Sequence, residues 1–255
     1  MATYRTNLYQ TTIIPRLIST ILLFGPLLSG QTGLRSYPIE ANVVTVHQLQ
    51  HKVPRAAQEE MEKANKAMRK QRRDDEVEHL RNALRIDPEY VAARNNLGVC
   101  LLKDDPASAI AQLEKAIDID PHEAALFHNL AIGYMITYKL DDAERAARSA
   151  IDLDRTNTRM RTLLGIILVL ERKYTAEALA DLEPATKEYP VAGLYAAQVL
   201  IKQQELSKAR LYVNGYLSSG DQRYRDFAER WLHYIDRSLA TSAAALPSPS
   251  VPAQQ

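Results

Sequence analysis

The chain repeats a short apolar signature at intervals close to 34 residues, and this periodicity constrains its fold more than any other feature. The segment Ala83-Leu-Arg-Ile-Asp-Pro88 returns as Ala116-Ile-Asp-Ile-Asp-Pro121, as Ala150-Ile-Asp-Leu-Asp-Arg155 and, more loosely, as Ala185-Thr-Lys-Glu-Tyr-Pro190. The leading alanines are 33, 34 and 35 residues apart. A fixed period of roughly 20 to 50 residues is typical of supersecondary units that stack into a continuous array.

Each period contains two apolar stripes at helical spacing, with turn signals between them. Leu97 and Leu101 belong to the first stripe of one period, and Leu113 belongs to the second. Between the stripes, Asp105-Pro106 combines a capping side chain with proline at the first helical position, which is a helix start signal. Small residues such as Gly98 allow neighbouring helices to approach closely. Each period is therefore predicted to form a pair of antiparallel helices.

The predicted helices, in five pairs, span residues 54–72, 74–86, 89–103, 105–118, 122–137, 141–153, 157–172, 175–188, 191–204 and 207–218. After them Asp221 is expected to cap a last helix, over 221–240. Phe227, Trp231, Tyr234 and Ile235 are spaced for one face of this helix, which indicates core packing.

The pattern resembles the tetratricopeptide repeat (TPR). The first helices carry Leu97-Gly98, Leu130-Ala131 and Leu164-Gly165 in phase, and Phe127-x-x-Leu130-Ala131-x-x-Tyr134 is the fullest copy of this signature. The resemblance covers roughly residues 54–218 and implies an all-α TPR α-solenoid: a right-handed superhelix of about five antiparallel helix pairs. Because stacked repeats leave an apolar end face, the helix over 221–240 is expected to act as a C-terminal capping helix. Residues 241–255 are too poor in core residues to fold.

The N-terminal residues differ from the rest of the chain. No Asp or Glu precedes Glu40, Arg5 and Arg16 are basic, and the apolar run 17–28 ends in Ser29-Gly30. Twelve helical residues span about 18 Å, well short of the ~30 Å hydrocarbon core of a bilayer. This layout predicts a signal peptide over 1–30, a linker over 31–53, and an exported protein, periplasmic or secreted.

Three alternatives to the signal peptide stay open. The segment 13–28 could be retained as a membrane anchor, the N-terminus could be an organellar transit peptide, or the start codon could be wrongly assigned. Membrane contact is expected only if the N-terminal segment is uncleaved.

Charge and cysteine content exclude several classes of partner and site. With 32 Lys and Arg against 31 Asp and Glu, the net charge is +1, so no concentrated basic surface for nucleic acid is expected. Cys100 is the only cysteine, which excludes an internal disulfide and a cysteine-rich metal site. His47 and His51 are four residues apart, but no third ligand lies near them in sequence, so no metal site is predicted.

The sequence contains no catalytic motif. A glycine-rich phosphate loop, a Gly-x-Ser-x-Gly elbow and a His-Glu-x-x-His pair are all missing. Cys100 lies on an apolar helix stripe with no basic neighbour, and such a cysteine is typically a small buried hydrophobe rather than a nucleophile. We therefore expect a protein that is not an enzyme and has no small-molecule cofactor.

A repeat solenoid offers a concave groove lined mainly by the first helix of each pair. Asn96 and Asn129 occupy equivalent positions in two of these helices. A carboxamide both donates and accepts, so it can pair with the backbone of an extended peptide, or else with another asparagine or a carbonyl of the protein itself. The apolar candidates likewise suit either a hydrophobic ligand segment or the inter-helix core. The predicted groove residues are Asn65, Asn95, Asn96, Val99, His128, Asn129, Ile132, Arg159, Thr162 and Ile166.

The resemblance also allows a comparison with TPR domains that hold chaperone C-termini through a carboxylate clamp. Met61, Asn65, Asn96, Ala125 and Asn129 stand at the corresponding positions, so the asparagines match and the cations are missing. A terminal carboxylate would lose its charge-assisted hydrogen bonds here, which disfavours a chaperone-tail receptor.

These observations favour an exported, non-catalytic adaptor or scaffold that binds a peptide segment or helix of another protein in its concave groove. The alternative is a membrane-anchored structural or assembly factor of the cell envelope, with residues 13–28 retained.

Overall fold

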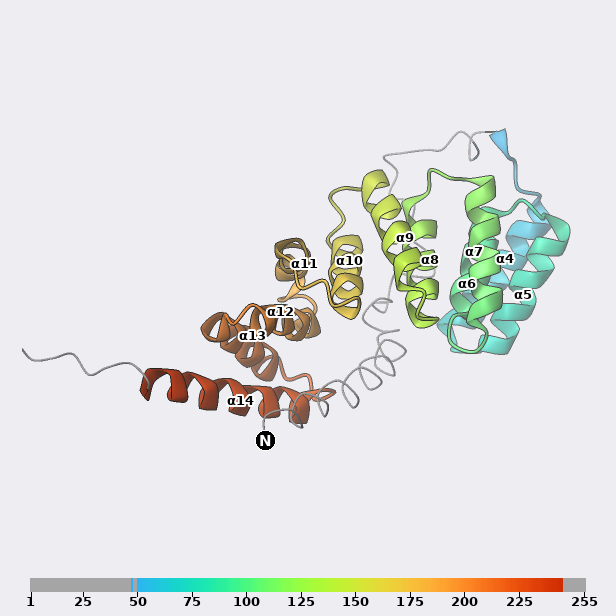
Figure 1. The fold of residues 1–255 in the computed structure, drawn as a ribbon. Helices are drawn as coiled ribbons and strands as arrows, with labels where there is room; N and C mark the ends of the chain where they lie inside the picture. Colours follow the sequence, from blue (N-terminus) through green and yellow to red (C-terminus); the bar gives the residue numbers. More distant parts are fainter. Residues whose placement is uncertain (1–46, 48–49, 245–255) are drawn as a thin grey trace, which may run out of the picture. The chain divides into compact units, whose positions relative to one another are not determined.

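The computed structural model describes residue 47 and residues 50–244, and in this part of the chain every regular element is helical (Figure 1). The predicted signal peptide over 1–30, most of the linker over 31–53, and residues 245–255 of the tail lie outside the described residues. The all-α fold predicted from the repeat is confirmed.

The helices alternate with short turns along the described chain. Their bounds are α4 Arg55–Arg69, α5 Arg73–Ile86, α6 Val91–Leu101, α7 Pro106–Ile119, α8 Ala124–Ile136, α9 Leu140–Leu153, α10 Thr158–Leu170, α11 Ala176–Leu182, the 3-10 helix η1 Glu183–Ala185, α12 Pro190–Lys202, α13 Leu206–Ser218 and α14 Arg225–Ala244.

The chain divides after Leu163 into two compact units. In the first unit, α4 packs on α5, α6 on α7, and α8 on α9, while α5 contacts α6 and α7 contacts α8. The first helices of successive pairs also meet, because α6 contacts α8 directly. In the second unit, α11 packs on α12, α12 on α13, and α13 on α14 (Figure 1). The helices of each unit thus pack mainly on their neighbours in sequence.

Close packing within a helix pair depends on the combined size of the side chains at two facing positions of the repeat. A Cβ atom on Gly98 would lie 2.7 Å from Leu113 Cγ and 3.2 Å from the backbone oxygen of Ala109. Gly165 stands in the same relation to Leu182 Cγ, at 2.8 Å. In the α8–α9 pair the same two positions hold alanines, Ala131 and Ala147, both buried. In the α6–α7 and α10–α11 pairs glycine therefore stands opposite leucine.

Local capping explains several of the helix boundaries. Asp105 accepts a hydrogen bond from the Ser108 backbone N–H at 3.1 Å, so the predicted cap is confirmed. Thr175 caps α11 in the same way, accepting the Ala178 N–H at 3.2 Å. The aspartates that end α5, α7 and α9 form turns of a second kind, in which the carboxylate accepts the N–H two residues ahead. For Asp87 this bond, from Glu89, is 3.1 Å long.

The structure differs from the predicted helices at two places. The helix predicted over 175–188 ends at Leu182 and gives way to η1, because Pro184 cannot donate a backbone hydrogen bond inside an α-helix. The last helix begins at Arg225, and Asp221 accepts the N–H of Arg223 at 3.0 Å in the preceding turn instead of capping it.

The apolar residues of α14 lie in different environments. Trp231 and Ile235 are buried, Phe227 stacks on Trp231 with ring centroids 4.5 Å apart, and Tyr234 is 42% exposed. The side of α14 that packs inward is therefore narrower than the predicted four-residue stripe.

Candidate functional site

A ladder of side-chain hydrogen bonds joins the first helices of the three repeats in the first unit. Asn129 Nδ2 on α8 donates to Asn95 Oδ1 on α6 at 2.7 Å, and Asn95 Nδ2 donates to Asn96 Oδ1 at 3.3 Å. Asn96 Nδ2 in turn contacts the thioether sulfur of Met61 on α4 at 3.8 Å. All four side chains are buried. We call this set, Asn129, Asn95, Asn96 and Met61, the asparagine ladder.

The ladder runs in one direction. Every amide donates towards α4, so the acceptor at its α8 end, Asn129 Oδ1, has no hydrogen-bond partner among the described residues. The interior carboxamide of Asn95 is bonded on both sides. From the sequence, these asparagines could bond either each other or a ligand. In the structure they bond each other, and one acceptor, Asn129 Oδ1, stays without a hydrogen-bond partner among the described residues.

His128 lies next to this unsatisfied end. Its side chain is only 1% exposed, and neither ring nitrogen has a partner among the described residues. Burial, together with the nearby positive charge of Arg159, lowers the pKa of His128 to about 3, so the ring is neutral at physiological pH. A neutral imidazole offers one donor and one acceptor.

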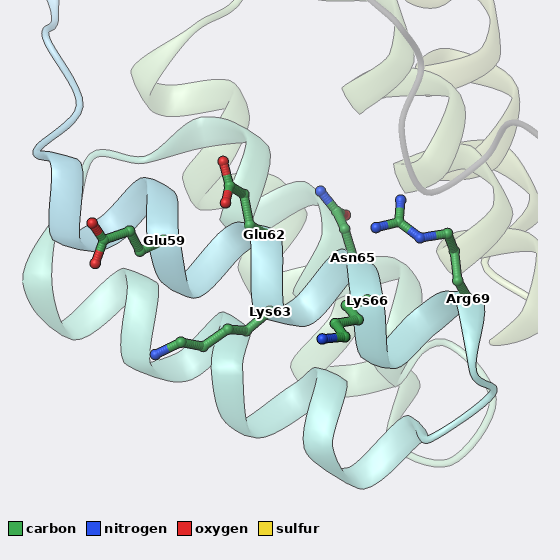
Figure 2. A pocket seen from close by; sticks show the side chains of 6 residues that line it. All are labelled: Glu59, Glu62, Lys63, Asn65, Lys66 and Arg69. Atoms are coloured by element: carbon green, nitrogen blue, oxygen red, sulfur yellow. The ribbon is translucent and has the colours of Figure 1, made fainter.

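A charged hollow lies on α4, the helix that also carries Met61 of the ladder. It has a volume of ≈ 550 Å³, and Figure 2 shows the six side chains around it, all from α4. Glu62 and Asn65 extend from the same side of the helix. The lining residues are Glu59, Glu62, Lys63, Asn65, Lys66 and Arg69. Of these residues only Asn65 was predicted from the sequence, although the three- and four-residue spacing of the others already places them along one side of a helix.

One charge of the hollow is held by an ion pair at its edge. Lys63 Nζ lies 2.5 Å from Glu60 Oε1, and His79 on α5 bonds the other oxygen, Oε2, at 2.9 Å. The hydrogen bond from Lys63, followed by that from His79, lowers the pKa of Glu60 to about 2. The same bond raises the pKa of Lys63. Glu60 thus joins α4 to α5 and tethers one of the three cations.

The remaining predicted groove residues are placed as follows. Val99 is half-buried, whereas Ile132 and Ile166 are 4% and 5% exposed, which is the burial of core residues. Thr162 donates to the Thr158 carbonyl of its own helix at 2.7 Å, and Arg159 is half-buried. Ile166 falls in the second unit and the other nine candidates fall in the first.

The segment before α4 is also fixed by a histidine. His51 Nε2 lies 2.8 Å from Asp87 Oδ2, and its ring stacks on that of His47. His51 is therefore held between Asp87 and the ring of His47. Among the described residues, no three or more His, Cys, Asp or Glu side chains are grouped as metal ligands, and no helix is both long and apolar enough to cross a bilayer.

The comparison with family models gives a match to the tetratricopeptide repeat over residues 61–124, which includes α5 to α7 and most of α4. Solved structures match over a longer range. The chain has the TPR fold. No curated protein matches the sequence.

Three solved TPR structures illustrate the likeness. PilF of Pseudomonas aeruginosa is 20% identical, with 75% of this chain and 93% of that chain covered and a TM-score of 0.58. MamA is 17% identical, with 76% and 98% covered and a TM-score of 0.56. YrrB, described as a TPR protein with an unusual peptide-binding site, is 19% identical, with 67% and 90% covered and a TM-score of 0.55. At these identities the likeness establishes the fold alone.

Proposed function

We propose that the protein is a non-catalytic interaction module that holds a peptide segment of a partner protein along α4, α6 and α8. The observation that carries the proposal is the asparagine ladder, which brings carboxamides of two successive repeats into line with the thioether of a third and ends in an unsatisfied acceptor, Asn129 Oδ1. Carboxamides can pair with the donors and acceptors of a peptide backbone whatever its side chains. The fold supports this use, since a similar TPR structure, YrrB, is described as having a peptide-binding site.

The proposal assigns different parts to the two ends of the ladder. The hollow on α4, with its three cations and two carboxylates, would accommodate the side chains of the bound segment, and the α8 end would bind its main chain. No paired titratable groups resembling an acid and a base occur along the ladder, which favours binding over catalysis.

A photo-crosslinking experiment tests the proposal. A photoreactive amino acid replaces Asn65, which lines the hollow, or Lys115, which is exposed on α7. We expect a partner adduct from position 65 and none from position 115. The adduct from position 65 should disappear with Asn129→Ala and persist with Asn82→Ala, a change of the same size on α5. Equal adducts from positions 65 and 115, or an adduct that Asn129→Ala leaves intact, would contradict the proposal.

We also propose that the protein is exported after removal of residues 1–30. The support is the basic, acid-free N-terminus and its short apolar run. The mass of the intact natural protein tests this: loss of about thirty residues agrees with a signal peptide, and a full-length mass favours the anchored assembly factor instead.

A further inference from the structure

The α4 end of the asparagine ladder closes on sulfur instead of oxygen. Asn96 Nδ2 lies 3.8 Å from the sulfur of Met61, whereas Asn129 Nδ2 donates to the amide oxygen of Asn95 at 2.7 Å. A thioether is only a weak hydrogen-bond acceptor. Met61 and Asn96 are 7% and 6% exposed, so little water can supplement this contact. The Nδ2 group of Asn96 is therefore buried with a weaker acceptor than the other amide donors of the ladder have.

The sulfur of Met61 also differs from the other methionine sulfurs that the structure describes. Met135 and Met160 are each 1% exposed, and Met68 is half-buried. Within the described residues, none of these three sulfurs accepts a hydrogen bond. Met61 belongs to a buried cluster of otherwise apolar side chains. Asn96 thus supplies a polar donor at one side of a sulfur that is apolar in its remaining surroundings.

An oxygen atom added to this sulfur would find a donor already in place. A donor that approaches a thioether faces a lone pair of the sulfur, and oxidation adds the new oxygen at a lone pair. A sulfur–oxygen bond inclined to the 3.8 Å line between Asn96 Nδ2 and the Met61 sulfur brings the oxygen to about 2.9 Å from Nδ2, a normal N–H···O length. A sulfoxide at Met135 or Met160 would have no such donor, and an unsatisfied buried oxygen destabilises a fold.

We propose that Met61 is an oxidation site, at which hydrogen peroxide converts the thioether to a sulfoxide that Asn96 binds. A sulfur lone pair attacks one peroxide oxygen, and the O–O bond breaks as the S–O bond forms. The departing hydroxide takes the proton of the transferred oxygen and leaves as water, so the sulfur loses the two electrons that the peroxide gains. Methionine sulfoxide is a modification that dedicated reductases reverse.

Oxidation then changes the contact between α6 and α4. The weak N–H···S contact of Asn96 becomes an N–H···O hydrogen bond to the sulfoxide, and the donor satisfies an oxygen that would otherwise be buried without a partner. This inference concerns a modification of the chain itself and does not depend on the proposed function.

Peptide mapping of the folded full chain after treatment with hydrogen peroxide is the first test. The reaction is run near pH 6, where few thiols are ionised because a free cysteine has a pKa of about 8.5. Mass spectrometry then measures the sulfoxide at each methionine. We expect Met61 to be oxidised several-fold faster than Met135 and Met160, since it is 7% exposed and they are 1% exposed.

Urea denaturation of treated and untreated protein then tests the part of Asn96. All variants carry Met68→Leu, which removes the half-buried methionine of α4. Oxidation should raise the unfolding equilibrium constant of Asn96→Leu at least about tenfold more than that of the parent, because the sulfoxide loses its donor. Asn129→Leu is the matched control: it breaks the other end of the ladder, keeps Asn96, and should respond to peroxide as the parent does. Met61→Leu should not respond.

The side-chain amide resonances of Asn96 give a readout that needs no variant of the donor. They should shift when Met61 is oxidised and stay constant when Met61→Leu is treated in the same way. The inference is overturned by a Met61 that is oxidised no faster than Met135 and Met160, by equal effects of peroxide on Asn96→Leu and its parent, or by unchanged Asn96 resonances. None of these results bears on partner binding, which the crosslinking experiment tests separately.

Discussion

Lowering the pH from 7 to 4 is expected to destabilise the protein strongly through His128, and replacing His128 by leucine is expected to remove that part of the loss. The ring is neutral in the folded state, where burial and Arg159 lower its pKa to about 3, but it binds a proton near pH 6.5 once the chain unfolds. Between these two values the unfolded state binds more protons, so the free energy of unfolding falls as the pH falls. The contribution of this one group amounts to about 3 kcal/mol between pH 7 and pH 4.

The measurement is urea denaturation at a series of pH values, followed by circular dichroism. His128→Leu should be more stable than the wild type at pH 7 by about 1–3 kcal/mol, since it removes an unsatisfied buried group, and should lose less stability on acidification. His122→Asn is the matched control, because His122 is exposed in the turn before α8. A wild type and a His128→Leu variant with parallel pH profiles would show that His128 titrates normally and is not a buried neutral ring.

The second large effect is expected where Gly98 faces Leu113. Gly98→Ala places a methyl group 2.7 Å from Leu113 Cγ and should destabilise the protein by about 1–3 kcal/mol. Leu113→Ala leaves a cavity in the α6–α7 pair and should cost about 2–5 kcal/mol. The double variant reproduces the alanine pair found in the α8–α9 repeat, so it should be more stable than the two separate losses predict, by about 1–2 kcal/mol.

The same denaturation experiment on the two single variants and the double variant measures this coupling. Gly215→Ala serves as the control, because no atom lies within 4 Å of a Cβ built there. This change should stabilise α13 by about 0.5–1 kcal/mol through helix propensity alone. If the losses in the free energy of unfolding from Gly98→Ala and Leu113→Ala are additive, the sizes of these two side chains are not coupled, and this explanation of the packing is wrong.

Much of the fold could be predicted from the sequence, because the repeat fixes the phase of every helix pair. The boundaries differ from the predicted ones by only a few residues where a cap is written into the sequence, as at Asp105 and Thr175. The main failure is the helix predicted over 175–188. Pro184 interrupts this helix in the middle of a repeat, and its last turns are replaced by η1.

The candidate site was only partly predictable. The equivalence of Asn96 and Asn129 indicated a polar line along the first helices, but the pairing of Asn129 with Asn95 depends on the stagger between α6 and α8, which spacing does not determine. Whether the ring nitrogens of His128 find hydrogen-bond partners depends on the side chains of every neighbouring helix. A local sequence pattern therefore cannot predict it. Ile132 was a candidate for either ligand or core, and its burial agrees with the core.

The most direct test of the central claim, that the α8 end of the ladder is a ligand site, is the ring nitrogen spectrum of His128 in long-range proton–nitrogen correlation NMR. A neutral imidazole is expected between pH 4 and 8, and its nitrogen shifts are expected to change when the partner segment captured from position 65 is added, while His122 keeps its shifts. A His128 ring that is protonated by pH 6, or whose shifts stay constant at saturating peptide, would contradict the account.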